Sequence, residues 1–220
     1  MTNDGKDRAD GDRSVADPSA VLRLSPLRDA QITGLVLAGG MGRRMQSRDK
    51  GLVAFRGKPM VTHVIERLAA QVGPLLINAN RNTDAYAAFG FPVIGDEVGG
   101  FAGPLAGLHA GMRACTTGLI VTAPCDSPFL PLDLVARLHA AMAAAIADLA
   151  VVRSGGFAQP VFALYNVALL PSLTAFLAGG GRKVDAWYST HRVAEVEFAD
   201  ETAFANINTL DELQAHERKP

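Results

Sequence analysis

The sequence has few cysteines, almost no excess charge and no long apolar run, and each shortage excludes a class of protein. Its two cysteines, Cys115 and Cys125, are too few for a disulfide framework, so we expect a reducing compartment. The formal net charge of -1 excludes a broad basic face for nucleic acid. The most apolar stretch, 138–152, is interrupted by His139 and Asp148 and is too short to cross a bilayer. We therefore expect neither nucleic-acid binding nor a membrane span.

What the sequence does contain is enough apolar material for one globular domain. Of the 220 residues, 49% are hydrophobic and 20% are charged, and a chain of this size buries about 70% of its unfolded surface. Residues 1–30 differ, because six aspartates and five basic residues alternate there without any apolar period. Such a segment cannot bury enough surface to order itself. We predict a disordered tail over 1–30 and a single domain over 31–220.

Short apolar runs alternate with helix-forming segments along the domain. Strands are expected at 32–38, 75–79, 91–94, 119–123, 149–153, 159–164 and 193–198, and helices from Pro59 to about Val72 and at 82–89, 103–115, 131–147, 171–177 and 182–191, with a last helix capped by Thr209 and Glu212. The strand at 159–164 is expected to cross or pair differently, and the alternating strand at 193–198 to lie at an edge. The pattern predicts an α/β fold: one doubly wound, Rossmann-like, mainly parallel sheet with helices on both faces.

Polar or glycine-rich loops follow four of the predicted strands. They cover 39–50, 78–81, 96–103 and Asp126. Because ligands bind beyond the carboxyl ends of the strands in such sheets, these loops predict a common binding site.

The first of these loops suits phosphate binding. Gly39 and Gly40 let backbone N–H groups approach phosphate oxygens, and Arg44 and Lys50 add positive charge. The glycine spacing matches neither a P-loop nor a dinucleotide-binding fingerprint. Taken alone, the loop could also be a tight turn with solvated arginines.

An ordered set of motifs resembles nucleotidyltransferases of the molybdenum cofactor guanylyltransferase (MobA) type. The set covers the chain from residue 32 to the last helix: Leu37-Ala38-Gly39-Gly40, Arg44-Met45, Asp49-Lys50-Gly51-Leu52, Gly57-Lys58-Pro59-Met60, His63-Val64, Asn78-Ala79-Asn80-Arg81, Val93-Ile94-Gly95-Asp96, Gly103-Pro104-Leu105-Ala106-Gly107, Pro124-Cys125-Asp126 and Asn206-Ile207-Asn208-Thr209. One departure is Gln46-Ser47-Arg48, where this family usually carries one or two glycines; it adds a cation at Arg48.

The resemblance implies a cytoplasmic enzyme that transfers GMP from GTP to the terminal phosphate of molybdopterin and releases pyrophosphate. It implies Mg²⁺ as cofactor, and transient contacts with the molybdenum-inserting protein and with enzyme-specific chaperones. We expect a monomer.

The resemblance also implies roles for individual residues. The catalytic set is Arg44, Lys50 and Asp126, with Asp126 holding the metal. The nucleotide-binding set is Leu37, Ala38, Gly39, Gly40, Lys50, Asn78, Asp96 and Asp126, and the acceptor-binding set is Asn206 and Asn208.

Three alternatives remain open at this point. Gly39 distinguishes the chain from related cytidylyltransferases, which usually read Leu-Ala-Ala-Gly, but a cytidylyltransferase or a sugar-phosphate nucleotidyltransferase of the same fold stays possible. A nucleotide-binding regulatory module without catalysis is the third alternative. Trp187 and Tyr188 could line a pterin pocket or belong to the core, and Cys125 is expected to be a small buried apolar side chain.

Removal of residues 1–30 tests the predicted tail. Because the segment has no apolar face to dock, the shortened protein should keep its melting temperature and its turnover nearly unchanged. Thermal unfolding and a pyrophosphate-release assay on both forms measure this. A large loss of stability would show that the tail packs against the domain.

Overall fold

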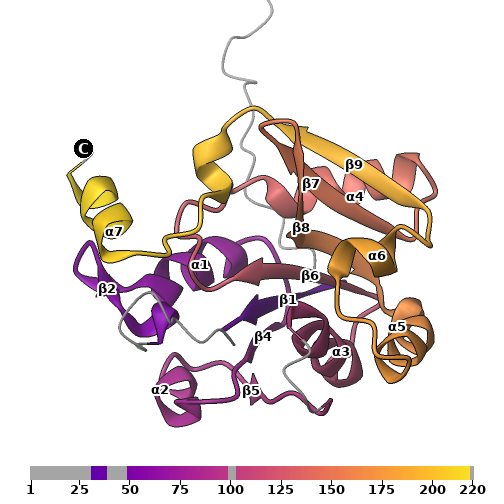
Figure 1. Ribbon diagram of the computed structural model, residues 1–220, viewed down its shortest axis with the longest axis horizontal. Coiled ribbons are helices and arrows are strands. Elements are labelled where there is room, and N and C mark those ends of the chain that lie inside the picture. The colour runs from indigo at the N-terminus through magenta and orange to yellow at the C-terminus, as the bar shows by residue number, and fades with distance from the viewer. Residues whose placement is uncertain (1–30, 39–48, 99–102, 219–220) are drawn as a thin grey trace, which may run out of the picture.

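The computed structural model describes residues 31–38, 49–98 and 103–218, and a seven-stranded sheet runs through the centre of this part of the chain (Figure 1). The strand order is β5-β4-β1-β6-β8-β7-β9. The strands are β1 (Ile32–Leu37), β4 (Leu75–Asn78), β5 (Val93–Ile94), β6 (Leu119–Pro124), β7 (Leu149–Ser154), β8 (Phe157–Asn166) and β9 (Val193–Phe198). The predicted α/β fold with a mainly parallel sheet is confirmed.

One strand reverses the direction of the sheet. β8 lies between β6 and β7 and is antiparallel to both, whereas β1 is parallel to β4 and β6, and β9 is parallel to β7. The segment predicted to pair differently, 159–164, is therefore the centre of the antiparallel strand β8. β9 lies at the edge, as predicted, and its residues alternate between buried and more exposed positions.

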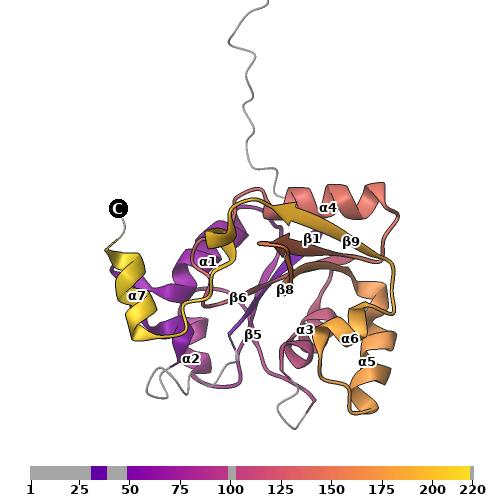
Figure 2. The same cartoon turned by 45° about the horizontal axis from the view of Figure 1, so that its top comes forward.

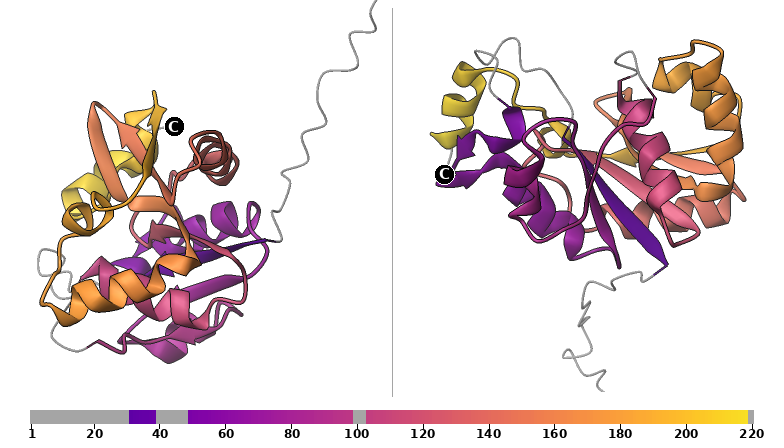
Figure 3. Two further views of the ribbon diagram at one scale, coloured as in Figure 1. Left: turned by 90° about the vertical axis from the view of Figure 1, so that its right-hand side faces the viewer. Right: turned by 90° about the horizontal axis from the view of Figure 1, so that it is seen from below.

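Helices cover both faces of the sheet (Figures 2 and 3). The helices are α1 (Met60–Ala69), α2 (Thr83–Ala87), α3 (Pro104–Ala114), α4 (Leu134–Ala144), α5 (Leu170–Ala178), α6 (Val184–Tyr188) and α7 (Leu210–Glu217). α1 and α4 pack their apolar side chains on one face, and α3, α5 and α6 pack theirs on the other. Trp187 of α6 is 1% exposed and belongs to the second core, so it lines no open pterin pocket.

Several predicted helix boundaries are wrong. Pro59 is the N-cap of α1 rather than its first residue, because it also ends a short strand, and α1 ends at Ala69. Helices α4 and α6 begin at Leu134 and Val184, later than predicted. The end of α1 was placed too late because Val72, which lies just after the helix, is buried like the apolar residues within it.

The sequence prediction missed a small hairpin. β2 (Ala54–Phe55) and β3 (Lys58–Pro59) pair antiparallel around Arg56 and Gly57, whose φ angles are 48° and 83°. Two consecutive positive φ angles are typical of the tight turns that close two-residue hairpin loops.

The C-terminal helix packs beside this hairpin (Figure 1). Leu213 of α7 and the buried Ile207 form a small core with Phe55 and Met60. The Arg56 guanidinium also donates a hydrogen bond of 3.0 Å to the carbonyl of His216. The predicted capping box of Thr209 and Glu212 is present at the start of α7. These contacts fix the segment just before α7.

The predicted tail, 1–30, lies outside the described residues, as do Gly39, Gly40 and Arg44. Within the described ranges, no helix is long and apolar enough to cross a membrane.

An ion pair at the start of β7 and β9 predicts a pH-dependent stability. Arg192 donates to both carboxylate oxygens of Asp148, at 2.6 Å from Nη2 and 3.2 Å from Nε, and these hydrogen bonds lower the pKa of Asp148 to about 2. A carboxylate with a lowered pKa stabilises the fold above its unfolded pKa of about 3.9, and this stabilisation is lost as the pH falls towards 2. Because the Arg192 side chain is 66% exposed, solvent screening keeps the effect on stability small.

We therefore expect Asp148→Asn to lower the free energy of unfolding modestly at pH 7, with a difference that shrinks between pH 4 and pH 2. Urea unfolding of both proteins at several pH values measures it. A difference that does not change with pH would contradict the assignment.

Candidate active site

The polar side chains predicted to form the site gather at one edge of the sheet. β1, β4, β5 and β6 are mutually parallel, so their carboxyl ends meet at the same edge. Asn78, Asp96 and Asp126 lie at or just beyond these strand ends, and Lys50 reaches the same edge through its contact with Asp126. This edge is where an α/β sheet of this kind binds its ligands.

Lys50 joins three segments that are far apart in the sequence. Its Nζ donates a hydrogen bond of 3.1 Å to Asp126 Oδ2 and one of 2.6 Å to Asn208 Oδ1. The side chains of Lys50 and Asp126 are 21% and 12% exposed, so the ion pair is only partly open to solvent. A phosphate group that enters this edge therefore meets a cation already held in place.

Asp49 fixes the backbone from which Lys50 extends. Its Oδ1 accepts a hydrogen bond of 2.5 Å from the Tyr86 hydroxyl and one of 3.2 Å from the backbone N–H of Gly51, and its Oδ2 accepts one of 3.0 Å from Asn82 Nδ2. The bond to Gly51 caps the short 3-10 helix Lys50–Leu52. The carboxylate thus ties the loop after β1 to helix α2.

Because residue 51 is a glycine, the backbone of this segment can lie close to Tyr86 and Cys125. A Cβ atom at position 51 would lie 2.5 Å from the Tyr86 hydroxyl and 3.2 Å from Cys125 Sγ. Burial raises the pKa of Tyr86 and of Cys125 far above the usual range, and neighbouring carboxylates act in the same direction. Both groups are therefore neutral at physiological pH, so Cys125 is a buried apolar side chain, as predicted, and not a thiolate nucleophile.

Asp126 is placed by the end of β6. The backbone N–H of Cys125 donates to the carbonyl of Leu37, which extends the pairing of β6 with β1 by one bond. The carbonyl of Asp126 then accepts from the backbone N–H of Ile207 at 2.9 Å. Asp126 is 8% exposed, and its carboxylate faces Lys50 rather than capping a helix or a turn.

The segment before α7 contributes two asparagines that contact different partners. Asn206 Oδ1 accepts a hydrogen bond from the Ser127 hydroxyl, whereas Asn208 Oδ1 accepts from Lys50. Ile207 between them is fully buried. Asn208 therefore belongs to the same cluster as Lys50 and Asp126.

A second cluster lies at the ends of β4 and β5. Asn78 Nδ2 donates to Asp96 Oδ1 at 2.9 Å, and Asn80 Nδ2 donates to Asp96 Oδ2 at 2.7 Å. Asn78 is 3% exposed, and a side chain at position 107 would collide with its amide oxygen, so Gly107 of α3 gives it room. Asp96 is thus an acceptor whose orientation is set by two amides.

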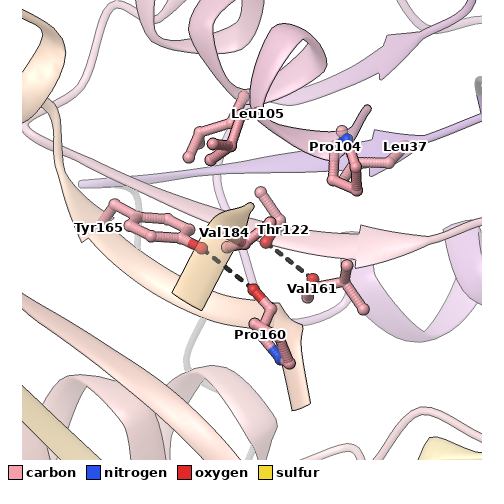
Figure 4. Close-up of a pocket in the computed structure, with 9 residues that line it drawn as sticks. Leu37, Pro104, Leu105, Thr122, Pro160, Val161, Tyr165 and Val184 are labelled. Atoms are coloured by element: carbon pink, nitrogen blue, oxygen red, sulfur yellow. Dashed lines mark hydrogen bonds between the residues drawn. The ribbon is translucent and has the colours of Figure 1, made fainter. Parts of the chain in front are cut away.

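Of the remaining predicted residues, the structure describes Leu37 and Ala38, which lie at the end of β1. Ala38 is buried and its backbone N–H donates to the carbonyl of Asn78 at 2.8 Å. Leu37 lines a cavity of about 10 Å³ together with Thr122 and Tyr165 (Figure 4). A volume of this size holds about one water molecule, so the cavity is not a pterin site in this conformation.

Four residues of these clusters were not singled out from the sequence: Asp49, Asn80, Asn82 and Tyr86. Two of them, Asp49 and Asn80, lie inside motifs that carry the resemblance, and this membership is the signal that could have found them. Asn82 and Tyr86 carry no such signal, because only the folded chain brings them to Asp49.

The side chains at this edge of the sheet limit which metal ion it could bind. Across the parts of the chain that the structure describes, no group of three or more His, Cys, Asp or Glu side chains is placed to hold a metal ion. A lone carboxylate such as Asp126 suits a hard cation that keeps waters and takes phosphate oxygens as its other ligands. The edge therefore combines a fixed cation, a carboxylate and an oriented acceptor, which suits phosphoryl chemistry on a nucleotide.

The sequence is similar to those of known nucleotidyltransferases. A model of the MobA-like NTP transferase domain matches residues 34–193. The chain is 58% identical over 193 residues to the molybdenum cofactor guanylyltransferase of Cupriavidus necator, a match that covers 86% of this chain and 97% of that one. It is 51% identical over 187 residues to the protein of the same name from Polynucleobacter asymbioticus, covering 83% and 94% of the two chains.

Solved structures extend the comparison. The molybdopterin-guanine dinucleotide biosynthesis protein A of Archaeoglobus fulgidus superposes with a TM-score of 0.68 at 26% identity, covering 84% of this chain and 96% of that one. A CMP:2-keto-3-deoxy-manno-octonic acid synthetase in complex with CTP shares the fold, with a TM-score of 0.69 at 15% identity and coverage of 86% and 97%. With a family model matching most of its length and relatives more than half identical to it, the chain belongs to the MobA-like NTP transferase family.

Proposed function

We propose that this protein transfers GMP from GTP to the terminal phosphate of molybdopterin, forming the guanine dinucleotide cofactor and releasing pyrophosphate. The observation that carries the proposal is the position of Lys50 Nζ between Asp126 and Asn208, at the sheet edge that also holds Asp96. The relatives named molybdenum cofactor guanylyltransferase support the choice of substrates.

The chemistry requires charge compensation more than proton transfer. A terminal phosphate oxygen of the acceptor attacks the α-phosphorus of GTP, a new P–O bond forms, and the bond to the leaving pyrophosphate breaks. Because a phosphate monoester is already largely dianionic at neutral pH, its oxygen needs no general base. Lys50 neutralises repulsion between the two anions, and Arg44 is proposed from the sequence to add a second cation. Gly39 and Gly40 are proposed to supply backbone donors to the phosphates.

Asp126 is proposed as the residue that would hold Mg²⁺. Its carboxylate is nearly buried beside Lys50, and a lone carboxylate fits an ion that keeps most of its waters. When bound, the ion supplies charge stabilisation on the phosphate oxygens. Asp126 itself orients Lys50 through their 3.1 Å contact.

Asp96 is proposed to recognise guanine. A carboxylate can accept hydrogen bonds from both the N1–H and the N2–H groups of guanine, and cytosine presents no such edge. Asn78 supports this carboxylate from the buried side, through the 2.9 Å bond from its Nδ2.

Asn206 and Asn208 are proposed to bind the acceptor. They lie on the segment between β9 and α7, and Asn208 contacts the same lysine that would meet the phosphates of GTP. An acceptor held there would have its terminal phosphate beside Lys50. We further propose that the protein works in the cytoplasm as a monomer, in transient contact with the molybdenum-inserting protein and enzyme-specific chaperones.

Nucleotide choice tests the proposed function directly. The protein is incubated with Mg²⁺, molybdopterin and each nucleoside triphosphate, and pyrophosphate release is followed. GTP should be used far better than CTP or ATP, because Asp96 pairs with the guanine edge. Equal turnover with CTP would favour the cytidylyltransferase alternative, and nucleotide binding without any turnover would favour a regulatory module.

A substitution at Asp126 tests the proposed metal carboxylate. Asp126→Asn keeps the size of the side chain but removes its charge, and should lower kcat on the order of 10²–10³-fold, as other single electrostatic deletions do. The fold should stay intact, as measured by circular dichroism and thermal unfolding. Asp185→Asn is the control, because Asp185 is an exposed residue in the first turn of α6 whose carboxylate, among the described residues, accepts only from the neighbouring backbone N–H of Ala186. An Asp126→Asn variant with normal turnover would refute the metal role.

A further inference from the structure

Asn80 holds Asp96 with both ends of one amide group. Its Oδ1 accepts a hydrogen bond of 2.7 Å from the backbone N–H of Asp96, and its Nδ2 donates one of 2.7 Å to Asp96 Oδ2. The amide thus contacts the main chain and the side chain of Asp96 at once. Such a two-point contact restricts both the position of the residue and the rotation of its carboxylate.

Asn78 supplies a third bond from a different direction. Its Nδ2 donates to Asp96 Oδ1, so each carboxylate oxygen accepts one amide N–H. A carboxylate oxygen has two acceptor positions, so each oxygen keeps one for a ligand. Fixing the plane of the carboxylate therefore fixes the direction of the two positions that remain.

We propose that Asn80 is a positioning residue that sets nucleotide selectivity, by orienting the free acceptor positions of Asp96 towards the N1–H and N2–H groups of guanine. The proposal rests on the proposed guanine recognition by Asp96. Asn80 does not itself contact the base. Its contribution is orientation, because a hydrogen bond weakens steeply when its geometry departs from the ideal.

Asn82, two residues further along, provides a natural contrast. Its Nδ2 donates to Asp49 Oδ2 at 3.0 Å, in the cluster that fixes Lys50. Both asparagines are exposed and follow the same strand, β4. One therefore acts on the base end of the site and the other on the phosphate end.

Calorimetric titration of GTP and ITP separates these two roles. ITP lacks the 2-amino group of guanine, so the ratio of the two affinities reports the bond between that group and Asp96. The wild-type protein should prefer GTP by about tenfold or more, the usual worth of one hydrogen bond to a charged group. In Asn80→Ala this preference should fall to about threefold or less, since the single bond from Asn78 leaves the carboxylate free to rotate.

Two further variants make the test decisive. Asn80→Asp keeps the acceptor for the Asp96 N–H but loses the donor and adds a like charge, so its preference for GTP should fall at least as far. Asn82→Ala should weaken GTP and ITP alike, by about the same factor, and leave the preference within about twofold of the wild-type value. Thermal unfolding of every variant accompanies the titrations.

The outcomes distinguish this proposal from the proposed function. An Asn80→Ala protein in which GTP and ITP binding weaken by the same factor, so that their ratio stays at the wild-type value, would overturn the positioning role, as would a protein that only loses melting temperature. A wild-type protein without preference for GTP over ITP would overturn it as well. Because binding is measured without turnover, a wild-type protein that prefers GTP yet transfers no GMP to molybdopterin would refute the function while leaving the role of Asn80 in place.

Discussion

The site depends on one partly buried ammonium group and its two oxygen partners. Lys50 contacts Asp126 across 76 residues of sequence and Asn208 across 158. A cation with little access to water is stable only when it is paired, so the loop after β1, the end of β6 and the C-terminal segment must all come together. The position of Lys50 also depends on Asp49, the residue before it. The Asp49 carboxylate accepts hydrogen bonds from the Gly51 N–H and from the Tyr86 hydroxyl, so it fixes the backbone on both sides of Lys50.

The short segment from Asn78 to Tyr86 serves both ends of the site. Asn78 and Asn80 orient Asp96, whereas Asn82 and Tyr86 hold Asp49. The separation between Asp96 and Lys50 is thus set by one strand end and one turn of helix. The proposed function needs such a connection, because catalysis by positioning requires a fixed geometry between distant contacts.

The sequence predicts the parallel part of the fold well, because buried strands such as β1 and β6 are short apolar runs that end at polar loops. It places Asp126 at the site for the same reason, since strand ends meet at one edge, whereas Lys50 was predicted from its charge in the glycine-rich loop and from the resemblance. The hairpin around Arg56 and Gly57 was missed because strands of two residues are too short to show an alternation of apolar and polar side chains. Asn82 and Tyr86 were missed because their partner, Asp49, is distant in sequence and no local pattern records a tertiary contact.

The bond between Asp126 and Ile207 has a consequence for how the protein is made. The backbone of Asp126 is held by a residue near the end of the chain, and Lys50 is held by Asn208, one position further. Contacts between residues so far apart form late in folding, because a long loop must close first. Residues 206–208 follow all seven strands of the sheet in the sequence, so a nascent chain contains every strand before the partners of Lys50 and Asp126 are made.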